Sequence, residues 1–282
     1  MRLVRQARQM AHVAQALRRA GKTVGFVPTM GALHDGHLSL IRAASRQTQV
    51  VVVSLFVNPL QFGPTEDYAR YPRDLKRDLH LAKAGGCDLV FAPDVSQMYP
   101  NDFRTFVEVE GLSDRLEGAS RPGHFRGVAT VVAKLFSLVQ PTIAYFGQKD
   151  YQQVLIIQRM VKDLGIPVAI RLMPTVREPD GLAMSSRNVS LSPDERRQAT
   201  VLHRALQLAR ERIRAGERNP RRVVDVMQDR IRREPAARVD DLAIVQAHTL
   251  EPLTTIRGHV AILLAVWIGS TRLIDNLLVD VS

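Results

Sequence analysis

Two histidines three positions apart are the residues of this chain best suited to do chemistry. His34 and His37 lie in the stretch 23–41, where an apolar run at 24–27 leads into a Pro–Thr–Met–Gly turn and then into a helical pattern from Leu38. Residues three apart share one helical face, so both imidazoles can reach the same ligand. A strand, a glycine turn and a helix start suit an anion, because the first amides of a helix lack intrahelical partners. Such units also occur in any parallel α/β protein, so the rest of the chain must decide whether they serve function here.

Two further segments carry polar side chains at the ends of predicted elements, one after a strand and one before a helix. Asn58 and Gln61 directly follow an apolar strand, and ligands gather at the carboxyl ends of parallel strands. Their neutral amides suit a hydroxyl or a carboxylate, although a loop closed by Asx turns is the structural alternative. Arg121, His124 and Arg126 cluster before a predicted helix start, where guanidinium groups can hold a carboxylate or a phosphate. Plain surface residues explain this second cluster equally well.

Two other segments point to a polyphosphate. Lys149 lies in the first turn of a predicted helix, where the helix dipole repels an ammonium group, so a functional reason for it is expected. Ser185, Ser186 and Arg187 are contiguous and suit a triphosphate tail, although serine-rich loops are common. These groups form neither a nucleophilic triad nor a metal cage. A site of this kind stabilises charge and positions reactants, as phosphoryl and nucleotidyl transfer require.

The composition describes a globular protein with a substantial core. Hydrophobic residues make up 45% of the 282, and no apolar run is long enough to span a membrane. The first 22 residues are expected to form an amphipathic helix rather than a secretory signal, with Val4, Met10, Val13 and Leu17 toward the core. The single cysteine, Cys87, excludes an internal disulfide and is predicted to be a buried structural thiol. A cytoplasmic location fits best.

The net charge of +11 raises the alternative of a nucleic-acid-binding protein. Acidic residues are interleaved among the arginines of the later helices, as is typical of solvated helix faces. Aromatic residues make up only 5%, which gives little support to a base-stacking surface. We therefore expect no nucleic-acid partner, and an enzyme that handles several anions accounts for the positive charge.

Short apolar runs alternate with helical patterns over the first part of the chain, which predicts an α/β fold with a Rossmann-like parallel sheet. Strands are expected at 24–27, 50–57, 88–92 and 142–146, with an extended segment at 166–176. Helices are expected at 75–84, 127–139 and 150–164. This predicts an N-terminal domain over residues 1–175, which contains most of the candidate phosphate- and acid-binding residues described above.

The character of the chain changes near Val176. Ser192, Pro193 and Glu195 form a helix-start pattern, and one long arginine-rich helix is expected from there to about Gly216. A helix over 220–233 and three strands over 239–247, 259–268 and 273–279 complete the prediction. Residues 176–282 are thus expected to form a smaller α+β domain with an antiparallel sheet. The polar segment 176–188 is predicted to act as a moving lid.

Five motifs in order resemble the pantothenate synthetase (pantoate–β-alanine ligase) family. They are FVPTMGALHDGH, SLFVNPLQF, RPGHFRGVATVV, YFGQKDYQQ and PTVREPDGLAMSSRN, and the match runs from about residue 23 to 191. The later region has the size expected of the family's C-terminal domain. The HDGH segment alone would indicate only the wider nucleotidyltransferase superfamily with its His-x-Gly-His pattern. A nucleotidyltransferase that leaves AMP on its product therefore remains the alternative.

The resemblance implies a two-step reaction. The carboxylate of pantoate attacks the α-phosphate of MgATP to give pantoyl adenylate and pyrophosphate, and the amine of β-alanine then gives pantothenate and AMP. The family is implied to be homodimeric and to use Mg²⁺ held mainly by phosphate oxygens. Whether Asp78 or Asp150 reaches the ion through water is left open.

The resemblance also assigns roles to residues. His37 is the implied proton donor, and His34, Lys149 and Arg187 join it as catalytic groups around the phosphates. Gln61 and Gln153 are the implied pantoate-binding glutamines, to which we add Asn58 and Arg121 as substrate-binding residues. The chain has Gln148 where the family often has glutamate, a change that leaves the implied roles intact and whose effect on ATP affinity is left open. The implied ATP-binding residues are Met30, Gly31, Ala32, Leu33, His34, Asp35, Gly36, His37, Gly147, Gln148, Lys149, Asp150, Val176, Met184, Ser185, Ser186 and Arg187.

Overall fold

The computed structural model describes residues 1–64 and 68–281, which form two compact units. The first unit comprises Met1–Asp114, Gly118–Gln148 and Gln153–Pro174. The second comprises Arg115–Glu117, Lys149–Gln152 and residues 175–281. Neither unit is a single continuous stretch of chain, because short segments near Arg115 and Lys149 join the second unit.

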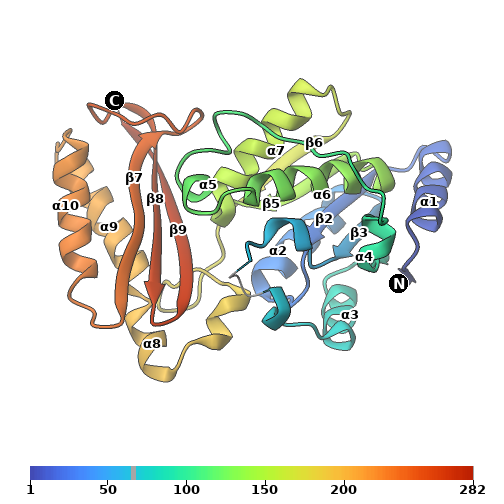
Figure 1. The fold of residues 1–282 in the computed structure, drawn as a ribbon, viewed down its shortest axis with the longest axis horizontal. Coiled ribbons are helices and arrows are strands. Elements are labelled where there is room, and N and C mark those ends of the chain that lie inside the picture. The colour runs from blue at the N-terminus through green and yellow to red at the C-terminus, as the bar shows by residue number, and fades with distance from the viewer. Residues whose placement is uncertain (65–67, 282) are drawn as a thin grey trace. The chain divides into compact units, whose positions relative to one another are not determined.

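A six-stranded parallel sheet forms the centre of the first unit, in the order β1-β4-β3-β2-β5-β6 (Figure 1). From β2 the chain builds the sheet outward through β3 and β4 on one side, and through β5 and β6 on the other. Ligands of open parallel sheets bind at the carboxyl ends of the strands where the order reverses in this way. The turns that follow β2 and β5 therefore occupy the expected binding edge. The strands are β1 (Arg2–Val4), β2 (Val24–Thr29), β3 (Val50–Leu55), β4 (Leu89–Phe91), β5 (Ile143–Gly147) and β6 (Ala169–Met173).

Helices cover this sheet with two separate apolar cores. One core packs side chains of α1, α6 and α7 with Phe26 and Val52, and the other packs α2 and α3 with Val27 and Val53. Neighbouring strand residues thus point to opposite cores, which explains why β2 and β3 are apolar on both faces apart from Thr29 and Ser54 near their ends. The helices are α1 (Ala7–Arg19), α2 (Asp35–Gln47), α3 (Leu75–Ala84), α4 (Val95–Met98), α5 (Glu117–Ser120), α6 (His124–Val139) and α7 (Tyr151–Asp163), with 3-10 segments η1 (Pro59–Gln61), η2 (Tyr68–Arg70) and η3 (Gln148–Asp150).

The second unit is a three-stranded antiparallel sheet, in the order β7-β8-β9, packed against helices (Figure 1). Leu202, Leu206 and Ile213 of α9 and Val223 and Met227 of α10 meet the sheet in one buried core. This matches the predicted small α+β arrangement. The elements are η4 (Ser186–Ser190), α8 (Pro193–Gln198), α9 (Val201–Arg214), α10 (Pro220–Ile231), β7 (Ala237–Gln246), β8 (Gly258–Ile268) and β9 (Thr271–Val281).

The structure corrects the predicted elements at three places. Val4 is buried as predicted, but it lies in strand β1 beside β4, and α1 begins only at Ala7. The single arginine-rich helix is instead two helices, α8 and α9. They are separated where Thr200 Oγ1 donates to the carbonyl oxygen of Arg197 at 2.8 Å, a local bond that competes with the helix ladder. Helix α6 begins at His124, so Arg126 lies inside the helix rather than before it.

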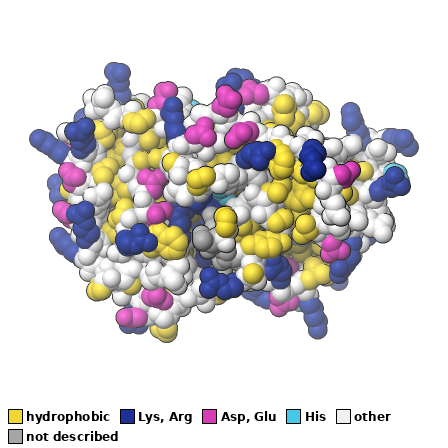
Figure 2. All heavy atoms as spheres, viewed as in Figure 1, with side chains coloured by type: hydrophobic (Ala, Val, Ile, Leu, Met, Phe, Trp, Pro, Cys, Tyr) yellow, Lys and Arg dark blue, Asp and Glu magenta, His cyan; other side chains and the backbone are white. Residues whose placement is uncertain are grey.

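The charged residues behave as the interleaved pattern predicts. On the face drawn in Figure 2, lysine and arginine side chains are scattered among acidic and apolar ones rather than gathered in one patch. Over the described residues, none of the helices is both long enough and apolar enough to cross a bilayer. Cys87 is buried, as expected, and its thiol donates to the carbonyl oxygen of Leu89 at 3.1 Å.

Candidate active site

The turn after β2 is held by a carboxylate from another element. Gly31 and Ala32 adopt positive φ values of 86° and 50°, a conformation that only glycine adopts freely. Asp78 of α3 accepts the amide of Ala32 with Oδ2 at 2.9 Å and the amide of Leu33 with Oδ1 at 2.8 Å. Asp78 is buried, and this burial raises the pKa of its carboxyl although both amide bonds act to lower it. Its two oxygens therefore fix the turn that leads into His34.

His34 and His37 cap the start of α2 with their own rings. The Gly36 amide donates to Nδ1 of His34 at 3.2 Å, and the His34 amide donates to Nδ1 of His37 at 3.3 Å. A ring nitrogen that accepts a hydrogen bond carries no proton, so each neutral imidazole is protonated at Nε2. The two ring centroids lie 4.1 Å apart. The pair therefore carries two adjacent Nε2–H donors.

This arrangement changes how the turn can receive an anion. The sequence predicted that the first amides of the helix would do so. Of these, the Gly36 amide already donates to a side chain, as do the amides of Ala32, Leu33 and His34 in the turn before the helix. The donors that suit an anion in this conformation are the imidazole Nε2–H groups. Side chains are thus expected to contribute to the phosphate contacts here, and the predicted contact with helix amides stays a prediction.

Gln61 lies in η1, and both the oxygen and the nitrogen of its side-chain amide are hydrogen-bonded. Its Oε1 accepts from Asn58 Nδ2 at 3.0 Å, and its Nε2 donates to the sulfur of Met30 at 3.2 Å. Asn58 Nδ2 also donates to the carbonyl oxygen of Gly127 at 3.0 Å, while the Tyr99 hydroxyl donates to Asn58 Oδ1 at 2.8 Å. Asn58 and Gln61 are both buried. The structure therefore joins the two predicted acid-binding amides to each other and brings that of Gln61 into contact with Met30 of the predicted ATP-binding segment.

Arg121 and His124 join this cluster through the backbone of Gln61. Arg121 contacts Nε2 of His124 at 2.9 Å, and because a guanidinium only donates, Nε2 is the acceptor. His124 Nδ1–H therefore donates to the carbonyl oxygen of Gln61, at 2.7 Å. Arg126, predicted to lie with them, is exposed and stacks its guanidinium carbon 3.8 Å from the ring centre of Phe106. Two of the three predicted basic residues thus reach Gln61.

Gly127 is what allows α6 to approach η1 so closely. A Cβ at this position would lie 2.2 Å from the carbonyl oxygen of Leu60 and 2.6 Å from the amide nitrogen of Gln61. No side chain fits in that space. The glycine therefore makes the bond between Asn58 and the Gly127 carbonyl possible.

In the second unit, three of the predicted phosphate-binding residues come together. Lys149, Ser185 and Arg187 line one small pocket. Lys149 Nζ lies 3.6 Å from Asp150 Oδ1, and the Lys149 carbonyl accepts from Nδ2 of buried Asn276 at 2.9 Å. The backbone at Lys149 is thereby tied to β9.

The segment before Arg187 is hydrogen-bonded rather than open. The Met184 amide donates to the carbonyl oxygen of Val176 at 3.0 Å, and Arg177 and Ala183 form an isolated antiparallel bridge. Ser185 then caps η4, because its Oγ accepts the amide of Arg187 at 3.2 Å. The predicted lid is thus a short hairpin followed by a capped 3-10 turn.

The remaining predicted residues lie at element ends. Gly147 ends β5, Gln148 begins η3, Asp35 begins α2, and Gln153 is half-buried in α7. Sequence reasoning considered Asp78 only as a metal contact and missed its role in the turn. The available signal was an acidic residue on the buried face of an amphipathic helix, four positions before the buried Ala82.

A metal centre made by the protein alone has no support in the described residues. Across 1–64 and 68–281, no three His, Cys, Asp or Glu side chains are grouped so that they could hold an ion. A divalent ion at this site would therefore need oxygen ligands from a bound substrate.

Comparisons with known proteins agree on one family. A family model described as Pantoate-beta-alanine ligase matches residues 2–278. A pantothenate synthetase from Moorella thermoacetica is 56% identical over 282 residues, 100% of both chains. A solved pantothenate synthetase from Thermus thermophilus is 53% identical with a TM-score of 0.93, covering 98% of this chain and 99% of that one. A pantoate-beta-alanine ligase from Francisella tularensis, solved with beta-gamma ATP and beta-alanine, is 34% identical with a TM-score of 0.82, covering 99% and 97%.

Proposed function

We propose a mechanism through pantoyl adenylate for this chain, which belongs to the pantoate–β-alanine ligase family and makes pantothenate from pantoate and β-alanine with ATP. In this mechanism the first step releases pyrophosphate and the second releases AMP. The observation that carries the mechanism is the pair of neutral imidazoles in the turn after β2. Because both Nδ1 atoms accept backbone amides, both Nε2–H groups suit phosphate oxygens. Such donors stabilise the charge that develops when the α-phosphate is attacked.

His37 is the proposed donor at the phosphates: its Nε2–H donates a hydrogen bond to a phosphate oxygen in the conformation described, and transfer of a proton would require its imidazolium form. His34 is its neighbour there. Lys149 contributes an ammonium for the α-phosphate and the departing pyrophosphate, and Ser185, Ser186 and Arg187 hold the β- and γ-phosphates. Their grouping in one pocket of the second unit supports this division of roles for Lys149, Ser185 and Arg187. No nucleophilic side chain is needed, because the pantoate carboxylate is itself the nucleophile.

Pantoate is held by Gln61 and Gln153, with Asn58 and Arg121 supporting Gln61. The contacts that fix the Gln61 amide from Asn58 and Met30 support a role in orienting a small polar acid. Neutral amides can bind the hydroxyls of pantoate without neutralising the carboxylate that must attack. Gln61 is also the proposed contact of β-alanine in the second step.

Mg²⁺ is the proposed companion of ATP. The ion prefers oxygen ligands and keeps several waters, which fits a site where phosphate oxygens supply most of the coordination. Asp150 is the better of the two candidate carboxylates, because its side chain is 47% exposed whereas Asp78 is buried with both oxygens in amide bonds. When bound, Mg²⁺ neutralises phosphate charge.

Four wider expectations remain predictions. They are a homodimer, a cytoplasmic location, a functional division into residues 1–175 and 176–282, and closure of segment 176–188 over ATP. Closure would exclude water from the mixed anhydride, which hydrolyses readily when exposed.

The test is a product assay with each substrate omitted in turn. The purified protein should release AMP in step with pantothenate only when pantoate, β-alanine and ATP are all present. When β-alanine is omitted, pantoate and ATP should give only about one pyrophosphate per enzyme molecule, because the adenylate then stays bound. Release of ADP would overturn the adenylate mechanism. An adenylated final product found by mass spectrometry would favour a plain nucleotidyltransferase.

A further inference from the structure

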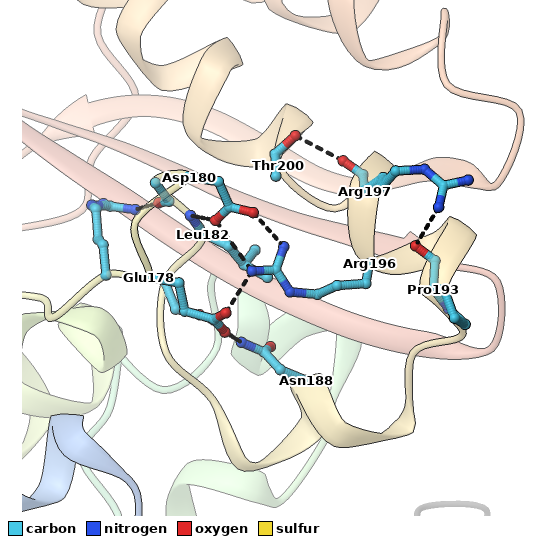
Figure 3. A network of polar contacts seen from close by, with 11 residues as sticks. Glu178, Asp180, Leu182, Asn188, Pro193, Arg196, Arg197 and Thr200 are labelled. Atoms are coloured by element: carbon cyan, nitrogen blue, oxygen red, sulfur yellow. Dashed lines mark hydrogen bonds and ion pairs between the residues drawn. The ribbon is translucent and has the colours of Figure 1, made fainter.

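Arg196 of α8 makes the densest set of ion pairs around the segment that carries Ser185 to Arg187. One guanidinium nitrogen donates to Asp180 Oδ2 at 2.7 Å, and the other donates to Glu178 Oε2 at 2.5 Å and to Asp180 Oδ1 at 3.1 Å (Figure 3). Only 25% of the Arg196 side chain is exposed. Its forked geometry thus engages two carboxylates at once, which a lysine cannot match.

Glu178 and Asp180 belong to a tight turn that precedes the phosphate-binding residues. The Gly181 amide donates to the Glu178 carbonyl at 2.9 Å, and the Glu178 amide donates to the Leu182 carbonyl at 2.8 Å. Gly181 has φ of 95°, and a Cβ there would lie 2.2 Å from His203 of α9. The turn therefore packs closely against His203, and any larger residue at position 181 would clash there.

Asn188 closes the network on the other side. Its Nδ2 donates to Glu178 Oε1 at 2.9 Å and to the carbonyl oxygen of Ala183 at 3.1 Å (Figure 3). Glu178 thus links Arg196 through one oxygen and Asn188 through the other. The residues between Ala183 and Asn188 are consequently enclosed by contacts at both of their ends.

We propose that Arg196 is a positioning residue for ATP: with Glu178, Asp180 and Asn188 it holds residues 184–187 in the conformation that binds the triphosphate. This inference rests on the proposed role of Ser185, Ser186 and Arg187. Arg196 also offsets the negative charge of two carboxylates that would otherwise repel a polyphosphate from this segment.

Arg196 is a better probe of this segment than Arg177, which belongs to the same hairpin. Arg177 forms a two-pronged ion pair with Asp275, at 2.6 and 2.9 Å, and the Asp275 side chain is only 1% exposed. Removing Arg177 would leave a buried carboxylate without its partner and threaten the fold. Arg196 and its partners lie nearer the surface, so the fold is expected to survive their replacement.

The test compares R196M with R196K and with R197M as a matched control. Arg197 is the next residue of the same helix, carries the same charge, is 72% exposed and pairs only locally with Asp194 and the Pro193 carbonyl in the contacts found for it. We expect the KM for ATP to rise about tenfold in R196M and about threefold in R196K, because lysine keeps the charge but loses the fork. In both Arg196 variants the KM values for pantoate and β-alanine should stay within about twofold of wild type. In R197M all three KM values should do so.

A second measurement separates positioning from general damage. E178Q should raise the KM for ATP like R196M, and the double variant E178Q/R196M should be no worse than R196M alone, since both act through one ion pair. An unchanged KM for ATP in R196M would overturn the inference. So would an equal rise in all three KM values together with a lower melting temperature, which would indicate a purely structural role.

One more variant distinguishes this inference from the function on which it rests. R187M should raise the KM for ATP by at least the amount seen in R196M. If R187M raises it and R196M does not, only the positioning role of Arg196 fails. If neither variant changes it, the proposed phosphate-binding role of the segment fails as well.

Discussion

Replacing Asp78 with asparagine tests whether the turn that carries His34 and His37 is held from α3. Asparagine has the same shape, so its Oδ1 can still accept one of the two amides, from Ala32 or Leu33. Its Nδ2 then faces the other amide, donor to donor. A hydrogen bond to a charged group contributes about 1.5–3 kcal/mol, and leaving a buried donor unsatisfied costs about 1–3 kcal/mol.

Relief from burying a carboxylate offsets part of this loss, since burial raises the pKa of Asp78. We therefore expect D78N to lower the free energy of unfolding by about 2–4 kcal/mol. The displaced turn should also reduce the rate of AMP release by roughly tenfold or more, because misplacing reacting groups by about 1 Å has effects of this size or larger.

Urea unfolding followed by circular dichroism measures the first effect, and a coupled AMP assay measures the second. D94N is the matched control, because Asp94 is exposed and its side chain makes no cap hydrogen bond at the start of α4. It should change stability by no more than about 0.5 kcal/mol. If D78N were as stable and as active as D94N, the claim that Asp78 holds the turn would be refuted.

Four further variants or measurements test other parts of the structure. His37→Ala removes an Nε2–H donor and the acceptor of the His34 amide, and we expect kcat to fall by roughly 10²–10³, as for other lost transition-state donors; a wild-type rate of AMP release would contradict the role. Gly147→Ala places a Cβ where no atom lies within 4 Å, so stability should change by less than about 0.5 kcal/mol. The KM for ATP should nevertheless rise severalfold if the nucleotide contacts this residue, and an unchanged KM would remove Gly147 from the site. Burial raises the pKa of Cys87 to about 12, so iodoacetamide at about pH 8 should label it only after unfolding; mass spectrometry of the folded protein reads this out. The hydrogen bond from Arg196 lowers the pKa of Asp180 below its usual value of 3.8, so its ionised form contributes stability above that pH and loses it as the pH falls through the lowered pKa. The urea midpoints of wild type and R196M should therefore converge on acidification from about pH 5 to about pH 2, and a constant gap would contradict the linkage.

The elements that sequence predicted best are those whose signals are local. The apolar run of β2 was predicted as a buried strand and the valine-rich run of β3 as a strand buried on both faces, and the structure confirms both. Serine, proline and glutamate at 192, 193 and 195 predicted the start of α8, where the structure has a complete capping box. Such patterns depend on residues within one turn of each other, so no knowledge of the fold is needed to interpret them.

The features that the sequence analysis got wrong or missed depend on partners far along the chain. Val4 was placed on a helix because its neighbours suit one, whereas pairing with Phe91 of β4, 87 residues later, makes it part of a strand. Asp78 binds the turn at Ala32 and Leu33 from 46 and 45 residues away. The same holds for Asn276, which fixes the Lys149 carbonyl across 127 residues. No motif near these residues marks the contact, because the sheet order that creates it is a property of the whole fold.

The two proposed phosphate-binding segments are supported in the same way, and this gives an expectation that runs against simple electrostatics. Asp78 takes two amides of the first segment, and Glu178 takes Arg196 and Asn188 beside the second. On charge alone, D78N and E178Q should strengthen ATP binding, since each removes a negative charge near a polyanion. If the carboxylates act by fixing the donors in advance, both variants should weaken it, because donors that must reorganise stabilise developing charge less well. The direction of the change in ATP affinity, measured by calorimetry for both variants beside D94N, decides between these accounts.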